Sequence, residues 1–130
     1  MDTLVSPVPG CRIELRPDRE RVLVLLHGEL DLAAVESVDR ELEALRMAGW
    51  RQVVVDLGAV SFMDLAGVRL LLGAFEQADQ AGSLFMVVAV SPQVRRILEL
   101  TGNVHLLAGV NRLTMHSERV RVPAPDQESK

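Results

Sequence analysis

A short apolar strand followed by an amphipathic helix is the clearest hydrophobic pattern in the chain. Residues 52–57 are rich in β-branched side chains, which is typical of a strand buried on both faces. We expect this strand to end at Gly58 and a helix to begin after Asp64, whose carboxylate can cap the first turn. The helix is predicted to run to Ala81, with an inward face formed by Val68, Leu71, Leu72, Phe75 and Ala78.

The N-terminal part of the chain predicts a hairpin and another helix. Residues 11–16 alternate apolar and polar side chains, residues 17–20 have the composition of a turn, and residues 21–27 are nearly all apolar. Two such strands joined by a short polar link favour a β-hairpin. Asp31 is then predicted to cap a helix that runs to about Ala48, with its inward face formed by Ala34, Val38, Leu42 and Leu45.

The C-terminal part is predicted to add a strand, a helix and a short final strand. Residues 84–90 are apolar, and Ser91–Pro92 is typical of a helix start. Residues 104–107 form the last apolar run, which we expect to be a strand. Residues 110–122 fit either a short helix or an extended segment, and residues 123–130 have the composition of a disordered tail.

The alternation of strands and helices after the hairpin predicts an α/β sandwich, in which helices cover a mixed sheet. The 130 residues suffice for a single domain with one core. Residues 1–10 contain two prolines and no periodicity, so we expect a flexible N-terminal arm there. The folded domain is predicted at residues 11–110, followed by a weakly ordered segment and tail at residues 111–130.

Charge and cysteine content narrow the possible partners and compartment. The net charge is −4 and the basic residues are scattered, which argues against nucleic acid and against an anionic membrane as partners. Cys11 is the one cysteine, so no internal disulfide can form, which fits a reducing cytoplasm. The N-terminus lacks the pattern of a signal peptide, and no apolar run is long enough to cross a membrane. We therefore expect a cytoplasmic protein without direct membrane contact.

The sequence offers no specific pattern of a metal site or of a nucleophile elbow, although a Ser/His/Asp arrangement remains open. His27, His105 and His116 are far apart and lack the companions that a metal site needs. Cys11 has no polarising neighbour in the sequence, and the glycines do not form a phosphate-binding loop. Asp31 and Asp64 can meet if both follow neighbouring strands, but no long loops surround them to build a pocket. We therefore expect no metal, no cofactor, no catalytic residues and a protein that is not an enzyme.

Three segments of the chain resemble the STAS family, in its anti-sigma-factor antagonist branch. The first runs from Asp56-Leu57 through Ser61-Phe62-Met63-Asp64 to Gly67; the others are residues 28–31 and residues 91–102. Their order and intervals match the family, and the likeness covers roughly residues 10–110. The resemblance implies a mixed β-sheet of about four or five strands with about three or four helices packed on it and a β-hairpin at the N-terminus.

The helix after Asp64 contains more apolar residues than one buried face requires, and these favour a protein-binding surface. The alternative is that neighbouring elements cover this helix on several sides. The resemblance favours docking and implies a partner-binding site formed by Asp31, Met63, Asp64, Leu65, Ala66, Gly67, Arg69 and Leu70.

One position departs from the family in a way that bears on regulation. The residue before the glycine is usually a serine or threonine that accepts a phosphate, and here it is Ala66, preceded by Leu65. Neither side chain can be phosphorylated. The resemblance implies that the partner is an anti-sigma factor, commonly a serine kinase of the histidine-kinase-like ATPase fold, and that binding releases a sigma factor. We therefore hypothesise a protein held permanently in its binding-competent form.

Two other functions remain open at this point. A STAS-like domain without the acceptor serine also suits a non-switching subunit of a transporter or of a stress-sensing complex. A ligand-binding or enzymatic role would need a pocket, which the sequence does not indicate. The sequence is compatible with a monomer or a weak dimer and leaves the identity of the partner open.

Overall fold

The computed structural model describes residues 4–8 and 10–106. The predicted segments at residues 107–130, which include the choice between helix and extended chain, lie outside the described residues. The chain order of elements is β1 (Leu4–Val8), β2 (Cys11–Asp18), β3 (Arg21–Leu30), α1 (Leu32–Met47), β4 (Gln52–Met63), α2 (Leu65–Ala81), β5 (Leu84–Val90), α3 (Pro92–Leu100) and the 3-10 turn η1 (Val104–Leu106).

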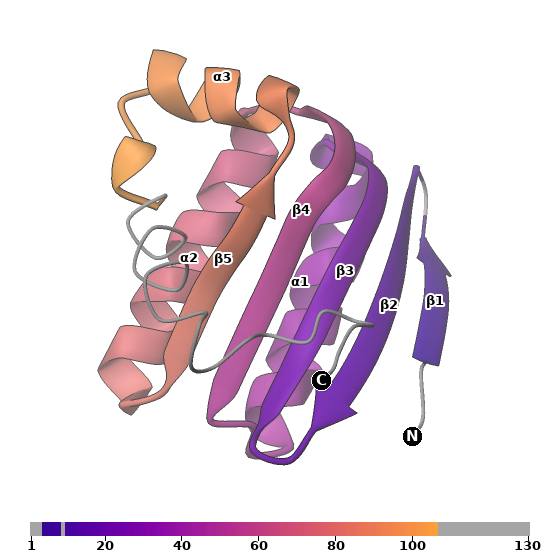
Figure 1. Ribbon diagram of the computed structural model, residues 1–130, viewed down its shortest axis with the longest axis vertical. Coiled ribbons are helices and arrows are strands. Elements are labelled where there is room, and N and C mark those ends of the chain that lie inside the picture. Colours follow the sequence, from indigo (N-terminus) through magenta and orange to yellow (C-terminus); the bar gives the residue numbers. More distant parts are fainter. Residues whose placement is uncertain (1–3, 9, 107–130) are drawn as a thin grey trace.

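The five strands form one mixed sheet in the order β1-β2-β3-β4-β5 (Figure 1). The first three strands pair antiparallel, and β3, β4 and β5 pair parallel. Helices α1 and α2 lie side by side against one face of the sheet, while α3 crosses above the ends of β4 and β5 (Figure 1). The predicted α/β sandwich and its hairpin between β2 and β3 are therefore confirmed.

The core lies between the sheet and helices α1 and α2. Alternate residues of β2 and β3 enter it, among them Ile13 and Leu26, which are almost completely buried. Helix α1 contributes the four inward residues that its pattern predicts: Ala34, Val38, Leu42 and Leu45. The burial of this apolar layer is the main contribution that holds the helices on the sheet.

Residues 4–8 form strand β1, so the prediction of a flexible arm is wrong for this segment. They pair antiparallel with β2, from Leu4 opposite Leu15 to Val8 opposite Cys11. The two prolines suppressed any local strand signal, but Pro7 lies on an edge strand, where a missing backbone donor is tolerated. Tertiary pairing with β2 thus outweighs the local composition.

Strand β4 continues beyond Gly58 to Met63, so the predicted strand end is wrong as well. Two register shifts against β3 each add one extra residue to β4. Because of these β-bulges, Leu57, Val60 and Met63 all face the core, and the residues between them face solvent. The first bulge is held by the Asp56 carboxylate, whose Oδ1 accepts from the Gly58 amide at 2.8 Å. The bulges interrupt the two-residue period that identifies a strand in sequence.

The predicted final strand is also wrong where the structure describes it, because residues 104–106 form a 3-10 turn. The Asn103 amide donates to the carbonyl of Leu98 at 2.8 Å, which turns the chain back at the end of α3. Leu106 is then buried against the core at 4 % exposure. An apolar run of this length does not distinguish a strand from a buried turn.

Candidate docking site at the helix N-termini

Helices α1, α2 and α3 all begin at the same end of the sheet (Figure 1). Strands β3 and β4 are parallel neighbours, and their last residues, Leu30 and Met63, lie opposite each other. Asp31 and Asp64, which follow them, therefore emerge side by side as the N-caps of α1 and α2. The sequence-based expectation that these two carboxylates meet at one edge of the sheet is confirmed.

Asp64 caps both helices at once. Its Oδ1 atom accepts from the amides of Ala66 and Gly67 at 3.0 and 3.2 Å, in the first turn of α2. Its Oδ2 atom accepts from the amide of Leu32 at 3.2 Å, in the first turn of α1. The carboxylate therefore satisfies backbone donors of two different helices and fixes their starts relative to each other.

Asp31 caps α1 alone. Its Oδ1 atom accepts from the amides of Ala33 and Ala34 at 3.1 and 3.3 Å. Together with the bond from Leu32 to Asp64, these contacts satisfy three of the four amide donors that a helix start leaves without partners. Two negative charges at two positive helix ends are also electrostatically favourable. Helix capping thus accounts for the positions of both carboxylates.

The start of α2 lies very close to the end of β3, and Gly67 makes this approach possible. A Cβ atom at Gly67 would lie 2.6 Å from the carbonyl oxygen of Leu30 and 2.6 Å from Cγ of Met63. This contact sets which side of α2 faces the sheet. Leu70 consequently enters the core at 8 % exposure, whereas Phe75, predicted to face inward, is 42 % exposed.

The second β-bulge shapes the rim of the site. The Ser61 hydroxyl donates to the Gly28 carbonyl at 3.2 Å, and the Ser91 hydroxyl donates to the Val60 carbonyl at 2.6 Å. Ser91 also accepts from the Val94 amide and so caps α3. The two hydroxyls satisfy carbonyls where the regular ladder is interrupted, and Phe62 is left facing solvent at 49 % exposure.

The structure divides the predicted site residues into a surface group and a buried group. Leu65 and Arg69 are exposed, and Asp31, Asp64 and Ala66 are partly exposed. Met63, Gly67 and Leu70 are buried, so a partner cannot contact their side chains directly, and their assignment to the docking surface is corrected. These three residues pack in the interior beneath the exposed residues of the site.

Sequence reasoning missed two exposed apolar side chains at the same end of the molecule. Leu32 is 76 % exposed at the first position of α1, and Phe62 is 49 % exposed at the end of β4. Leu65, at the first position of α2, is 50 % exposed. The sequence contained a signal for the exposure of Leu32, because Leu32 follows the N-cap Asp31 just as Leu65 follows the N-cap Asp64. Phe62 could not be found this way, because its direction depends on the bulge.

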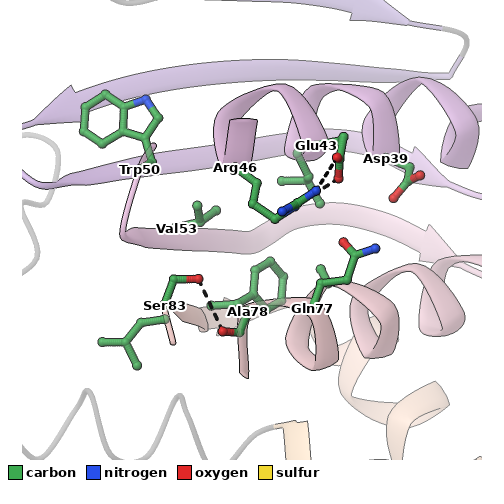
Figure 2. Close-up of a pocket in the computed structure, with 12 residues that line it drawn as sticks. Asp39, Glu43, Arg46, Trp50, Val53, Gln77, Ala78 and Ser83 are labelled. Atoms are coloured by element: carbon green, nitrogen blue, oxygen red, sulfur yellow. Dashed lines mark hydrogen bonds and ion pairs between the residues drawn. The ribbon is translucent and has the colours of Figure 1, made fainter. Parts of the chain in front are cut away.

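A separate hollow lies between the C-terminal halves of α1 and α2, at the opposite end of the helices. Figure 2 shows Asp39, Glu43 and Arg46 of α1 facing Gln77 of α2 across it, above a floor that includes Val53. The Arg46 guanidinium hydrogen-bonds to Glu43 and holds the pKa of that carboxyl below its usual value. The two capping aspartates are not among the residues that line this hollow.

Comparison with known proteins identifies the family. The model of the STAS domain family matches residues 12–118, which is most of the chain. The chain belongs to the STAS domain family. The STAS match includes both capping aspartates and the whole surface group described above. This family is one of binding modules rather than enzymes.

Named relatives of this STAS domain include two antagonists of anti-sigma factors. It is 33 % identical over 79 residues to the anti-sigma-B factor antagonist of Staphylococcus aureus, covering 61 % of this chain and 73 % of that one. It is 32 % identical over 92 residues to the anti-sigma F factor antagonist of Paenibacillus polymyxa, covering 70 % and 79 %. The resemblance seen in the sequence motifs, to the antagonist branch of the family, is thereby confirmed.

Solved structures agree with this assignment. The unphosphorylated form of the anti-sigma factor antagonist SpoIIAA superposes with a TM-score of 0.66 at 26 % identity, covering 85 % of this STAS domain and 98 % of SpoIIAA. An anti-sigma factor antagonist from Mycobacterium paratuberculosis gives a TM-score of 0.67 at 25 % identity, covering 78 % and 86 %. The murine anion transporter Slc26a9 shares the fold at 20 % identity and a TM-score of 0.56, covering 66 % of this chain and 14 % of the transporter.

Within the described residues, none of the helices is both long and apolar enough to cross a membrane. The same part of the chain holds no group of three His, Cys, Asp or Glu side chains placed to bind a metal ion.

Proposed function

We propose that this STAS domain is an anti-sigma-factor antagonist that binds an anti-sigma factor at the helix N-termini and thereby releases a sigma factor. We define the docking surface as the exposed and partly exposed residues Asp31, Leu32, Phe62, Asp64, Leu65, Ala66 and Arg69. The observation that carries the proposal is the exposure of Leu32, Phe62 and Leu65 around two rigidly capped helix starts. Exposed apolar side chains gathered next to polar groups are typical of protein-binding sites.

The rigidity of the two helix starts supports docking rather than a loose contact. The double cap at Asp64 and the close approach at Gly67 hold the first turns of α1 and α2 in place before any partner arrives. A preorganised surface loses less conformational entropy on binding, so more of the interaction energy appears as affinity. We propose that this anti-sigma factor is a serine kinase of the histidine-kinase-like ATPase fold.

Ala66 makes the switching behaviour of this chain different from that of its family. A phosphate at this position would add nearly two negative charges beside Asp64, in the middle of the docking surface. Ala66 lies in the first turn of α2, where its amide donates to Asp64, and it has no hydroxyl to accept a phosphate. We infer that the protein stays competent to bind and is controlled by its abundance, by another ligand or by a competing partner.

Substituting Ala66→Asp should weaken binding to the anti-sigma factor by at least about 1 kcal/mol, because it places an uncompensated charge in the interface. Isothermal titration calorimetry with the purified anti-sigma factor measures this change. Gln80→Asp adds the same charge at an exposed position in the last turn of α2 and serves as the control. Equal affinities for Ala66→Asp and the unchanged chain would exclude Ala66 from the interface.

The absence of a phosphate switch has a direct test. After incubation with its partner kinase and ATP, the intact protein should keep its unmodified mass. The hydroxyl that most needs checking is Ser61, which is exposed and lies one residue before Phe62 of the docking surface. Detection of a phosphate mapped to Ser61 would show that the switch has moved rather than disappeared.

A second candidate function keeps the docking surface and changes the partner. The lack of a hydroxyl at Ala66 suits a non-switching STAS subunit of a transporter or stress-sensing complex equally well. Affinity capture from the native host, followed by mass spectrometry, separates the two functions. Recovery of an anti-sigma factor supports the antagonist, whereas recovery of transport or stress-complex subunits without one supports the alternative.

A further inference from the structure

The hollow between the C-terminal halves of α1 and α2 lies beside two helix ends of the same design (Figure 2). Gly49 follows α1 and Gly82 follows α2, and both are left-handed, with φ of 93° and 73°. The next residues, Trp50 and Ser83, each donate their amide to the carbonyl five residues earlier, at 3.2 and 2.9 Å. Both of these residues line the hollow. Backbone hydrogen bonds therefore fix this side of the hollow in advance of any ligand.

The buried part of the lining is apolar. Leu42, Ala78 and Phe85 are at most 9 % exposed, and the partly exposed Val53 and Ala74 line the hollow with them. A ligand that enters transfers its own apolar surface from water onto these side chains, which is favourable. The hollow therefore fits a ligand with an apolar body.

The charged groups of the lining leave one negative charge without compensation. The lining contains two carboxylates, those of Asp39 and Glu43, and one guanidinium, that of Arg46. Arg46 donates to Glu43 through both Nε and a terminal nitrogen, so these two charges compensate each other. In the part of the chain that the structure describes, the exposed Asp39 forms no ion pair. The charge of Asp39 therefore favours a cation.

We propose that this hollow binds a small organic cation, whose apolar body packs against the buried lining and whose ammonium group pairs with Asp39. Gln77 faces Asp39 across the hollow, and its side-chain oxygen can accept a second hydrogen bond from the ammonium (Figure 2). An anion is disfavoured, because the guanidinium of the lining is already paired with Glu43. The site does not depend on the proposed docking surface, which lies at the opposite ends of the same two helices.

Trp50 makes occupancy of the hollow directly measurable, because it is the one tryptophan of the chain and the chain has no tyrosine. Phenethylamine is the probe, and phenethyl alcohol and phenylacetate offer a similar body with no charge and with a negative charge. Titration of the Trp50 fluorescence with the amine should saturate with a dissociation constant of about 1 mM or lower, an affinity within reach of a ligand of this size. The alcohol should bind at least about threefold more weakly, and phenylacetate more weakly still.

Substitutions in the lining test which groups recognise the amine. Asp39→Asn keeps the shape of the side chain and removes its charge, so it should weaken phenethylamine by about threefold to fivefold and leave phenethyl alcohol unchanged. Asp79→Asn is the matched control, because Asp79 is exposed on α2 and is not among the residues that line the hollow. Ala74→Leu places a larger side chain in the hollow and should abolish binding of both compounds, with thermal unfolding as the check that this variant is folded.

Three results would contradict the site. If Asp39→Asn binds phenethylamine as tightly as Asp79→Asn, or if the alcohol binds as tightly as the amine, Asp39 does not recognise a cation. If the amine changes neither the Trp50 fluorescence nor the backbone NMR signals of Gln77 and Phe85, the hollow does not bind it. If folded Ala74→Leu still binds the amine with the affinity of the unchanged chain, the amine binds elsewhere.

Discussion

At the scale of single residues, the site depends on one glycine at which any side chain would clash. Gly67 lies where the first turn of α2 contacts the end of β3, and an added Cβ would meet the backbone oxygen of Leu30 at 2.6 Å. A backbone atom of a central strand cannot move aside as a flexible side chain can. The motif glycine is therefore required by packing, independently of any partner.

Gly67→Ala should lower the free energy of unfolding by about 2 kcal/mol, the usual cost of forcing an extra carbon into a packed region. Gly73→Ala is the matched control in the same helix, because nothing lies within 4 Å of a Cβ placed there. It should raise stability by about 0.5–1 kcal/mol, since alanine favours the helix interior. Urea denaturation of the two variants measures both changes, and equal effects would contradict the close approach at Gly67.

At the scale of elements, Asp64 connects two helices that are distant in sequence. Its carboxylate bridges the amide of Leu32 in α1 and those of Ala66 and Gly67 in α2. The parallel pairing of β3 and β4 brings these helix starts together. Because Asp64 caps both helices, a substitution that disrupts the start of α2 should also destabilise the start of α1.

Asp64→Asn should destabilise the protein by about 1–2 kcal/mol, because its amide group faces the Leu32 amide and leaves that donor without an acceptor. Asp31→Asn provides the comparison, since Asp31 uses one oxygen and its cap survives the change. Hydrogen exchange should accelerate at Leu32 in the Asp64 variant. Unchanged exchange there would mean that the bond between the two helices contributes nothing.

At the scale of the whole molecule, one buried thiol gives folding stability a pH dependence that is easy to isolate. Burial of Cys11 raises the pKa of its thiol above the ordinary value of 9.0, and the nearby Asp31 charge acts in the same direction. The folded state therefore keeps the proton to a higher pH than the unfolded state. The chain has no tyrosine and one lysine, Lys130, so few other groups titrate between about pH 9 and pH 11.

The free energy of unfolding should accordingly fall as the pH rises above about 9, because the unfolded chain releases the thiol proton first. In Cys11→Ala this decline in the free energy of unfolding should be smaller. Below about pH 8, the difference in the free energy of unfolding between Cys11→Ala and the unchanged chain should stay constant. Chemical denaturation across this range measures both curves. Parallel curves would show that the Cys11 proton is equally well held in the unfolded chain.

Local patterns predicted much of the fold correctly. The hairpin, the capped starts of α1, α2 and α3, and the alternation of strand and helix follow from periodicity and from the polar residues at helix starts. The proximity of Asp31 and Asp64 also followed, because parallel neighbouring strands end at the same edge. These features depend on contacts within a few residues or on a general rule of topology, so the sequence alone determined them.

Tertiary structure decided which residues the site presents. The bulges in β4 expose Phe62, the approach of Gly67 to β3 buries Leu70, and pairing with β2 turns residues 4–8 into a strand. Each outcome depends on a neighbour that is distant in sequence, which no local pattern encodes. The amino-acid order thus determined the elements and their caps, whereas packing against the sheet determined their rotation and the composition of the exposed surface.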